Sequence, residues 1–273
     1  MRKSEFLAIA TAGVIAGCSF YSYEKSTQQV VNERSVAQTE ARKVGDAPDF
    51  GSISDVTQKK QAFFDYLRPG IALENKRIQR ERQRLESIQA NFVEKNLSNS
   101  ELEDAKRLGQ LYNLELPSGG VNESWINEML HRVDVLPEAL VLVQGANESA
   151  WGTSRFATQA NNYFGQWCYS AGCGLVPLQR SEGMTHEVAK FSSVQQSIHG
   201  YFMNVNRNAA YHDLRQIRYE RHLSGQSLTD TDAAMALTEG LLKYSERGEA
   251  YVNDLQAMIR HNEPFWETPL ANQ

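Results

Sequence analysis

The stretch from Pro137 to Trp167, PEALVLVQGANESAWGTSRFATQANNYFGQW, constrains the fold more than any other part of this 273-residue chain. Its first part predicts a helix, because proline suits a first helical position and a nearly unbroken apolar run follows it. Gly145, Gln144 and Val141 lie three, four and seven positions before Glu148, so all four share one helical face. That face is small or apolar, and burial favours the protonated form of a carboxyl, which a general acid needs.

Residues that suit sugar binding follow Glu148. Amide side chains can hydrogen-bond the hydroxyl and acetamido groups of a pyranose, and aromatic rings can stack on its C–H face. The candidates in chain order are Trp151, Ser154, Asn161, Asn162, Tyr163 and Phe164. The alternative is a buried helix end, with an incidental glutamate and a capping pair of asparagines.

The run NESAWGTSRFATQANNYFGQW resembles the motif of a bacterial endo-β-N-acetylglucosaminidase family, glycoside hydrolase family seventy-three, which includes the flagellar peptidoglycan hydrolases. That motif reads E-S-x-W-G-x-S, a gap, and then N-N-x-F-G. The wider chain looks like the Bax-type branch, and the resemblance covers the C-terminal half. It implies a lysozyme-like domain that acts on peptidoglycan, with Glu148 as the acid.

Apolar periodicity separates a helical region over residues 56–118 from a mixed region over residues 119–265. In the first region we expect a helix break at Pro69 and then one apolar stripe at helical spacing. Glu74 and Glu81 stand where a second seam would need apolar residues, so we expect one helix lying on the catalytic body rather than a coiled coil. This region is also a candidate site for a protein partner.

The mixed region contains several helical patterns and one hairpin pattern. The hairpin runs from Leu175 through a polar turn at 181–183 to Phe191. We therefore expect an α+β fold that is mainly α, and the resemblance implies a lysozyme-like plan with a small β-hairpin. Residues 266–273 are expected to form a tail.

Cleavage of a glycosidic bond usually takes two carboxyls. The hairpin offers Glu182 in its turn and Glu187 in its returning strand, and we favour Glu187 because a strand holds a side chain more firmly. The resemblance also implies a second glutamate on the hairpin and a tyrosine after the next helix, for which Tyr211 is the best match. The alternatives are surface glutamates and a packing tyrosine, and the mechanism is open between retention, inversion and substrate assistance.

The N-terminus has the pattern of an export signal. Arg2 and Lys3 precede an apolar run that is too short to span a bilayer and ends in Ile15-Ala16-Gly17-Cys18. This ending resembles a bacterial lipobox, which implies lipidation of Cys18 and an outer-membrane lipoprotein facing the periplasm. The alternative is an ordinary signal peptide or an uncleaved anchor. Residues 19–55 are polar and predict a flexible tether.

The cysteines fit an exported protein. Of the three cysteines, Cys18 belongs to the lipobox, and Cys168 and Cys173 are close enough to close a tight loop, so we predict a disulfide between them. A metal pair is the alternative, but no histidine with ligand spacing is nearby. The net charge of −5 and the lack of a basic motif argue against nucleic acid, and no cofactor motif is present.

The resemblance implies a peptidoglycan hydrolase that cleaves the β-1,4 bond after N-acetylglucosamine, and the setting of Glu148 agrees with carboxyl general-acid catalysis. A lytic transglycosylase or muramidase of the same fold is one alternative. A non-catalytic protein that binds peptidoglycan glycan strands is the other.

Overall fold

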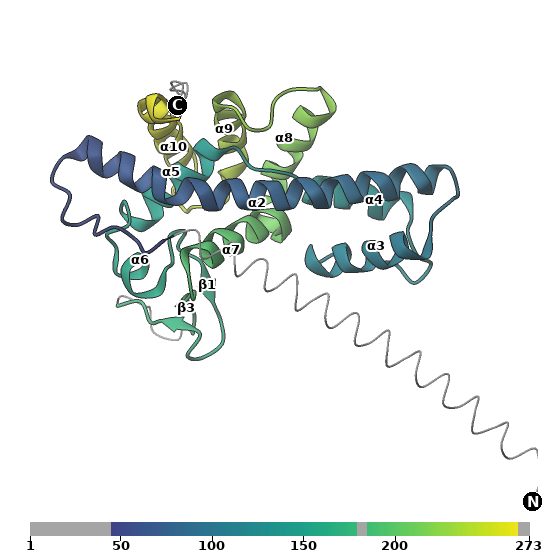
Figure 1. The fold of residues 1–273 in the computed structure, drawn as a ribbon, viewed down its shortest axis with the longest axis horizontal. Helices are drawn as coiled ribbons and strands as arrows, with labels where there is room; N and C mark the ends of the chain where they lie inside the picture. The colour runs from purple at the N-terminus through teal and green to yellow at the C-terminus, as the bar shows by residue number, and fades with distance from the viewer. Residues whose placement is uncertain (1–44, 179–184, 267–273) are drawn as a thin grey trace, which may run out of the picture. The chain divides into compact units, whose positions relative to one another are not determined.

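Helix α2 (Val56–Val93) runs for 38 residues in the computed structural model and lies across several other helices (Figure 1). The structure describes residues 45–178 and 185–266. The side chain of Asp55 caps α2 by accepting a hydrogen bond from the Gln58 backbone N–H at 2.7 Å. The predicted apolar stripe is buried, and α2 packs on helices α5 (Glu138–Ser149) and α7 (Val194–Arg207), as expected for one helix lying on the body.

The predicted break at Pro69 is wrong, because α2 continues through it. A proline inside a helix removes one hydrogen bond and costs about 3 kcal/mol. Here the residues on both sides are anchored, since Leu67 and Ile71 are both fully buried. Gly70 allows a close approach to α7, because a Cβ at this position would lie 2.5 Å from Ile198 Cδ1. Burial on both sides therefore outweighs the cost of the proline.

The two glutamates of α2 lie in a buried polar cluster. Arg77 bonds Glu74 at 2.9 Å and Glu81 at 2.7 Å, and the Tyr112 hydroxyl donates to Glu81 at 2.5 Å. Burial raises the pKa of Glu74, but His199 and Arg77 lower it more, and the net pKa is below the usual value. These carboxylates are thus paired, as buried charges must be.

The other helices surround α5 and α2. They are α3 (Asn99–Leu111), α4 (Glu123–Arg132), α6 (Arg155–Ala160), α8 (His212–Leu223), α9 (Thr231–Thr238) and α10 (Glu249–Asn262), with short 3-10 helices η1 (Ala209–Tyr211), η2 (Glu239–Leu241) and η3 (Glu263–Phe265). Every residue of α5 from Ala139 to Ala146 is buried, and α5 packs against α2, α9 and α10. Pro137 is the residue that precedes this helix rather than its first member.

A small antiparallel sheet flanks the helices. It contains β1 (Trp167–Cys168), β2 (Gly174–Leu175) and β3 (Glu187–Ala189) in the order β1-β3-β2. Leu175 and Trp167 both pair with Val188, from opposite sides of β3. The predicted hairpin is therefore confirmed in β2 and β3, while β1 was not predicted. The fold class is confirmed as α+β, mainly α and lysozyme-like.

The N-terminal predictions lie mostly outside the described residues. The undescribed residues include the signal segment 1–18 with Cys18, most of the 19–55 tether and most of the 266–273 tail. From Asp46 onward the chain groups into one compact unit, so the regions 56–118 and 119–265 share one core. Across 45–178 and 185–266, no helix is both long and apolar enough to cross a membrane.

The contact between η2 and α8 provides a test of the packing. A Cβ at Gly240 would lie 2.2 Å from Leu214 Cα and 2.3 Å from its backbone nitrogen, and these backbone atoms cannot rotate away. We expect Gly240→Ala to lower the free energy of unfolding by about 3 kcal/mol in urea titrations. The control is Gly119→Ala, where a Cβ would meet nothing within 4 Å and the change should stay within about 0.5 kcal/mol. Equal stability of the two variants would contradict this packing.

Candidate active site

Helix α5 carries Glu148 from the core to the surface. Glu148 is half-buried and is the penultimate residue of the helix. Ala150, Trp151 and Gly152 then adopt positive φ angles of 51°, 58° and 77°, which turns the chain sharply. The hydroxyl of Ser149 fixes this turn, because it accepts a hydrogen bond from the Gly152 N–H at 2.8 Å. The backbone beneath Glu148 is therefore held in one geometry.

The two carboxylate oxygens of Glu148 have different surroundings. Oε1 accepts a hydrogen bond from the Tyr251 hydroxyl at 3.0 Å and another from the Asn147 amide at 3.3 Å. Oε2 lies beside Gly165, where a Cβ would be 3.4 Å from it, an ordinary contact distance. Gly165 has a positive φ of 63°, a conformation that favours glycine, so the backbone turns beside this oxygen.

A chain of hydrogen bonds through buried side chains ends on Glu148. The Tyr201 hydroxyl donates to Gln144 Oε1, and Gln144 Nε2 donates to the Tyr251 hydroxyl at 3.1 Å. Tyr251 then donates to Glu148. Each step points toward the carboxylate, so the chain presents an O–H donor to Oε1. Gln144 is fully buried one helical turn before Glu148.

The two tyrosines of this chain and two neighbouring ones form what we call the tyrosine cluster: Tyr201, Tyr211, Tyr244 and Tyr251. The rings of Tyr211 and Tyr244 lie 5.7 Å apart, and those of Tyr244 and Tyr251 lie 5.2 Å apart. Burial raises the pKa of all four phenols above the usual range, and the charge of Glu148 adds to the rise. The phenols therefore stay neutral and act as hydrogen-bond donors at neutral pH.

The structure brings Tyr211 into this cluster, but its side chain is only 2% exposed. The charge of Glu148 acts on the Tyr211 phenol through space, and the Tyr211 side chain hydrogen-bonds Tyr244. The sequence reasoning missed Tyr244, Tyr251 and the role of Gln144. Gln144 had a usable signal, because it lies four residues before Glu148 on the same face. Tyr251 had none, since it is 103 residues away in sequence.

Trp151 packs against α2 instead of standing open beside the acid. Its ring contacts Phe63 and Phe64 edge-on, with centroids 5.6 and 5.4 Å away, and Lys60 lies over the ring at 5.4 Å. Phe50 closes the space beneath the following turn, where a Cβ at Gly152 would meet its ring at 2.4 Å. Trp151 therefore supports the turn, and because it is half-buried its contact with sugar stays a prediction.

The other predicted sugar-binding residues also support the site from within. Tyr163 and Phe164 are 1% and 2% exposed, so they offer no surface to a ligand. Ser154 caps α6 by accepting from the Ala157 N–H, and the Asn161 amide donates to the Phe191 carbonyl at 3.1 Å. Tyr163 and Phe164 therefore serve local structure, while Ser154 and Asn161 are half-buried and their contact with sugar stays a prediction.

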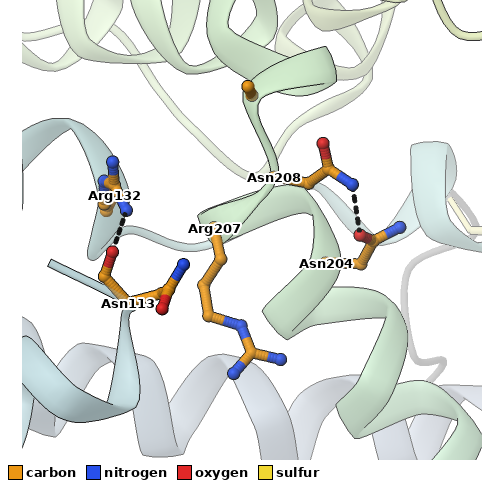
Figure 2. Close-up of a pocket in the computed structure, with 6 residues that line it drawn as sticks. Asn113, Arg132, Asn204, Arg207 and Asn208 are labelled. Carbon is orange, nitrogen blue, oxygen red and sulfur yellow. Dashed lines mark hydrogen bonds between the residues drawn. The ribbon is translucent and has the colours of Figure 1, made fainter.

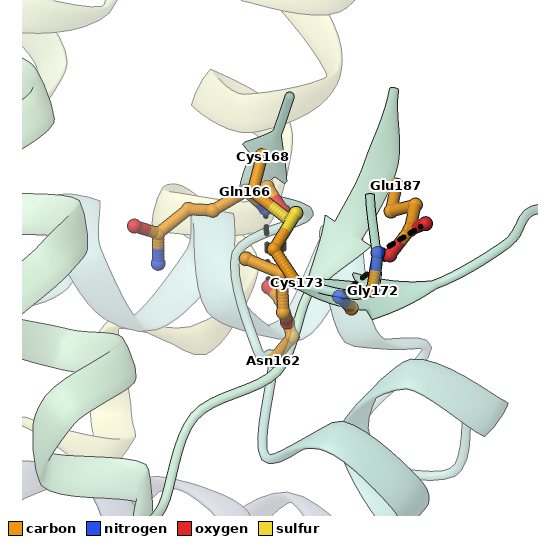
Figure 3. Close-up of a disulfide and its surroundings, with 8 residues drawn as sticks. Asn162, Gln166, Cys168, Gly172, Cys173 and Glu187 are labelled. Atoms are coloured by element: carbon orange, nitrogen blue, oxygen red, sulfur yellow. Dashed lines mark hydrogen bonds between the residues drawn. A yellow bond between two sulfur atoms is a disulfide. The ribbon is translucent and has the colours of Figure 1, made fainter. Parts of the chain in front are cut away.

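Asn162 joins the loop after α6 to the sheet. Its amide donates to the carbonyls of Gln166 and Ala189, each at 2.9 Å, and its Oδ1 accepts from the Gln166 N–H at 3.1 Å. Figure 3 shows Asn162 and Gln166 beside the disulfide. These bonds hold Gly165 next to Glu148 and fix the start of β1.

The predicted disulfide between Cys168 and Cys173 is confirmed, with a Cα–Cα distance of 6.2 Å. Glu187 lies next to it and is 7% exposed (Figure 3). Its two oxygens accept from the backbone N–H groups of Gly172 at 3.0 Å and Gly174 at 2.8 Å. Glu187 thus holds the loop that the disulfide closes. The alternative carboxylate, Glu182, lies outside the described residues.

Cys168, Cys173 and Glu187 lie close enough together to be considered as metal ligands. The sulfurs of Cys168 and Cys173 and a Glu187 oxygen all lie within 4.8 Å of one another. The sulfurs are joined in the disulfide, however, and metals are bound by thiolates. With the disulfide intact, this group therefore lacks the ligands that a metal needs.

A cavity of about 630 Å³ lies away from these residues, at the ends of α3, α4 and α7 (Figure 2). Its lining comprises Asn113, Arg132, Asn204, Arg207, Asn208 and Ala209. Arg132 donates to the carbonyls of Tyr112 and Asn113, so its guanidinium links the end of α4 to the end of α3. No predicted site residue lines this cavity.

Comparison with known proteins identifies the family. The profile of the family described as mannosyl-glycoprotein endo-beta-N-acetylglucosaminidase matches residues 123–264, which include Glu148, the sheet and the tyrosine cluster. The chain belongs to this glucosaminidase family. Protein bax of Escherichia coli (strain K12) is 32% identical over 235 residues, which cover 86% of this chain and 81% of that protein. The resemblance to glycoside hydrolase family seventy-three and to its Bax-type branch is therefore confirmed.

A solved structure of a type VI secretion system effector-immunity complex from Pseudomonas protegens also matches. It is 21% identical, covers 59% of this chain and 89% of that chain, and has a TM-score of 0.27. At that score it supports no structural argument. Membership of the glucosaminidase family supports a glycoside hydrolase activity of the peptidoglycan-cleaving kind.

The role of Glu187 in holding the loop can be measured as stability. Glu187→Gln replaces an oxygen with an NH₂ that faces a backbone N–H, so one donor is left without an acceptor. We expect a loss of about 2–4 kcal/mol in the free energy of unfolding by urea. The control is Glu115→Gln on an exposed loop, which should change stability by less than about 0.5 kcal/mol. If Glu187→Gln is as stable as this control, Glu187 does not hold the loop.

Proposed function

We propose that this protein is a peptidoglycan hydrolase that cleaves the β-1,4 bond after N-acetylglucosamine, with Glu148 as the general acid. One observation carries the proposal: a half-buried carboxyl ends a buried helix and receives a directed chain of hydrogen bonds at Oε1. Membership of the glucosaminidase family supports the reaction class.

The surroundings of Glu148 suggest which oxygen carries the proton. Oε1 already accepts from Tyr251 and Asn147, so an added proton belongs on Oε2, beside Gly165. Oε2 then donates to the glycosidic oxygen as the bond to the anomeric carbon breaks. Tyr251 is a positioning residue here, because it acts on the substrate only through Glu148.

The contacts of Glu187 bear on the second step of the mechanism. Each of its oxygens accepts a hydrogen bond from a backbone N–H group, and its side chain is buried. This favours substrate assistance, in which the acetamido oxygen bonds to the anomeric carbon while Glu148 protonates the leaving oxygen. Water then opens the cyclic intermediate, with Glu148 as the base.

If Glu187 is instead the catalytic base, Glu187→Gln will fold normally, lose activity at least about 100-fold and regain it with added azide.

Two rival functions remain distinct. A lytic transglycosylase or muramidase would use the same acid but leave N-acetylmuramic acid or its anhydro form at the fragment end. A non-catalytic protein would bind glycan strands without cutting them.

The protein is further proposed to be an outer-membrane lipoprotein facing the periplasm, on the basis of the lipobox-like sequence at Cys18. Fractionation of cell envelopes tests that location.

The first test is the product of the reaction. Purified peptidoglycan digested by the wild-type protein should give fragments that end in reducing N-acetylglucosamine, as identified by mass spectrometry. Glu148→Gln should lower the rate by about 100-fold or more with an unchanged melting temperature. Ends in N-acetylmuramic acid or its anhydro form would establish the rival enzyme, and no fragments from the wild type would favour the binding protein.

The second test removes the hydroxyl that contacts Glu148. A hydrogen bond to a charged group is worth about 1.5–3 kcal/mol, so Tyr251→Phe should lower kcat by about 10- to 100-fold with little change in KM. Tyr219→Phe is the matched control, because its hydroxyl bonds Asn127 at 3.3 Å outside the tyrosine cluster. An unchanged kcat in Tyr251→Phe would show that the hydrogen-bond chain does not serve catalysis.

A further inference from the structure

Two large aromatic side chains lie exposed immediately after the loop that borders Glu148. Trp167 in β1 is 55% exposed, and Tyr169, two residues later, is 73% exposed. A single exposed aromatic residue needs no explanation, but two aromatic residues so close together beside a candidate active site do. Neither residue was among the sugar-binding candidates of the sequence.

The ring of Trp167 is held in a fixed plane. It stacks on the imidazole of His186, with centroids 4.2 Å apart and an angle of 14° between the planes. His186 directly precedes β3, whose Val188 pairs with Trp167 in the sheet. One face of the indole is thus covered by the histidine, and the exposed area belongs to the remainder of the ring.

The backbone places Trp167 close to Glu148. A Cβ at Gly165 would lie 3.4 Å from Oε2 of Glu148, so the backbone of Gly165 runs beside this oxygen. Trp167 follows two residues later, which limits the Cα–Cα distance between Gly165 and Trp167 to about 7 Å. The connecting residue, Gln166, is fixed, because its side chain donates to the Ser197 carbonyl at 2.8 Å and its own carbonyl accepts from Asn162. The backbone that carries the indole is therefore fixed, and it begins beside the acid.

We propose that the open face of Trp167 is a stacking platform for a pyranose ring of the glycan strand, next to the sugar whose bond is cut, and that Tyr169 extends this platform. The electron-rich face of an indole attracts the C–H groups of a sugar, and a ring fixed before binding loses little entropy. This inference rests on the proposed function for its choice of ligand. A lipid surface is a poorer match, because insertion into lipid does not require a ring held in one plane.

The test uses the full-length Glu148→Gln protein, so that binding is measured without cutting. Binding to purified sacculi is followed by co-sedimentation, and binding to a soluble N-acetylglucosamine tetramer by titration. We expect Trp167→Ala to weaken both by about 3- to 10-fold and Trp167→Phe to retain most of the affinity, with unchanged melting temperatures. Leu178→Ala is the matched control, because Leu178 is an 87% exposed apolar residue that follows β2, and its loss should leave binding unchanged.

Two outcomes would overturn the platform: Trp167→Ala binding as tightly as its parent, or Leu178→Ala losing as much affinity. Vesicles of phosphatidylethanolamine and phosphatidylglycerol form a separate arm, and binding to them that depends on Trp167, without any effect on sugar binding, would assign the patch to lipid. The proposed function fails separately. Wild-type protein that cuts nothing, while Trp167→Ala still weakens sacculus binding, would leave the platform standing without the hydrolase.

Discussion

The burial of α5 on all sides is the constraint on which the site depends. A helix that is apolar around most of its surface must be enclosed, and α2, α9 and α10 pack against it. Gly145 permits close packing of this helix, because a Cβ there would lie 3.1 Å from Leu67 and 3.3 Å from Phe164. The first half-exposed carboxyl at the end of this rigid rod is Glu148, so its position is set by the core and not by a loop.

The same core determines the polarity around the acid. Gln144 is the polar residue inside the buried part of α5, and its amide must find partners there. It finds Tyr201 on one side and Tyr251 on the other, and the second of these donates to Glu148. The requirement to satisfy one buried amide therefore also orients the carboxylate.

The sequence predicted the elements whose causes are local. The α5 helix with Glu148 near its end, the hairpin of β2 and β3 and the disulfide all follow from periodicity, spacing or a long motif. The partners of Glu148 could not be predicted, because contact with Tyr251 is made across 103 residues and depends on how α10 docks. The paired asparagines show the opposite error: Asn162 carries a polar pattern typical of ligand binding, yet it is 1% exposed and serves backbone groups. The sequence shows that an asparagine amide needs hydrogen-bond partners. It does not show whether those partners are sugar hydroxyls or backbone carbonyls.

The docking of α2 has a consequence for what counts as the enzyme. The family profile begins at residue 123, but Phe63, Phe64 and Leu67 of α2 fill the same core as α5. A polypeptide cut to the length of the profile would present the apolar surface that α2 covers to water, and such surfaces associate with one another. The region that shows the family relationship, residues 123–264, is therefore shorter than the region that shares one core, which includes α2. A recombinant protein trimmed to residues 123–264 would lack α2, and part of its apolar core would be exposed.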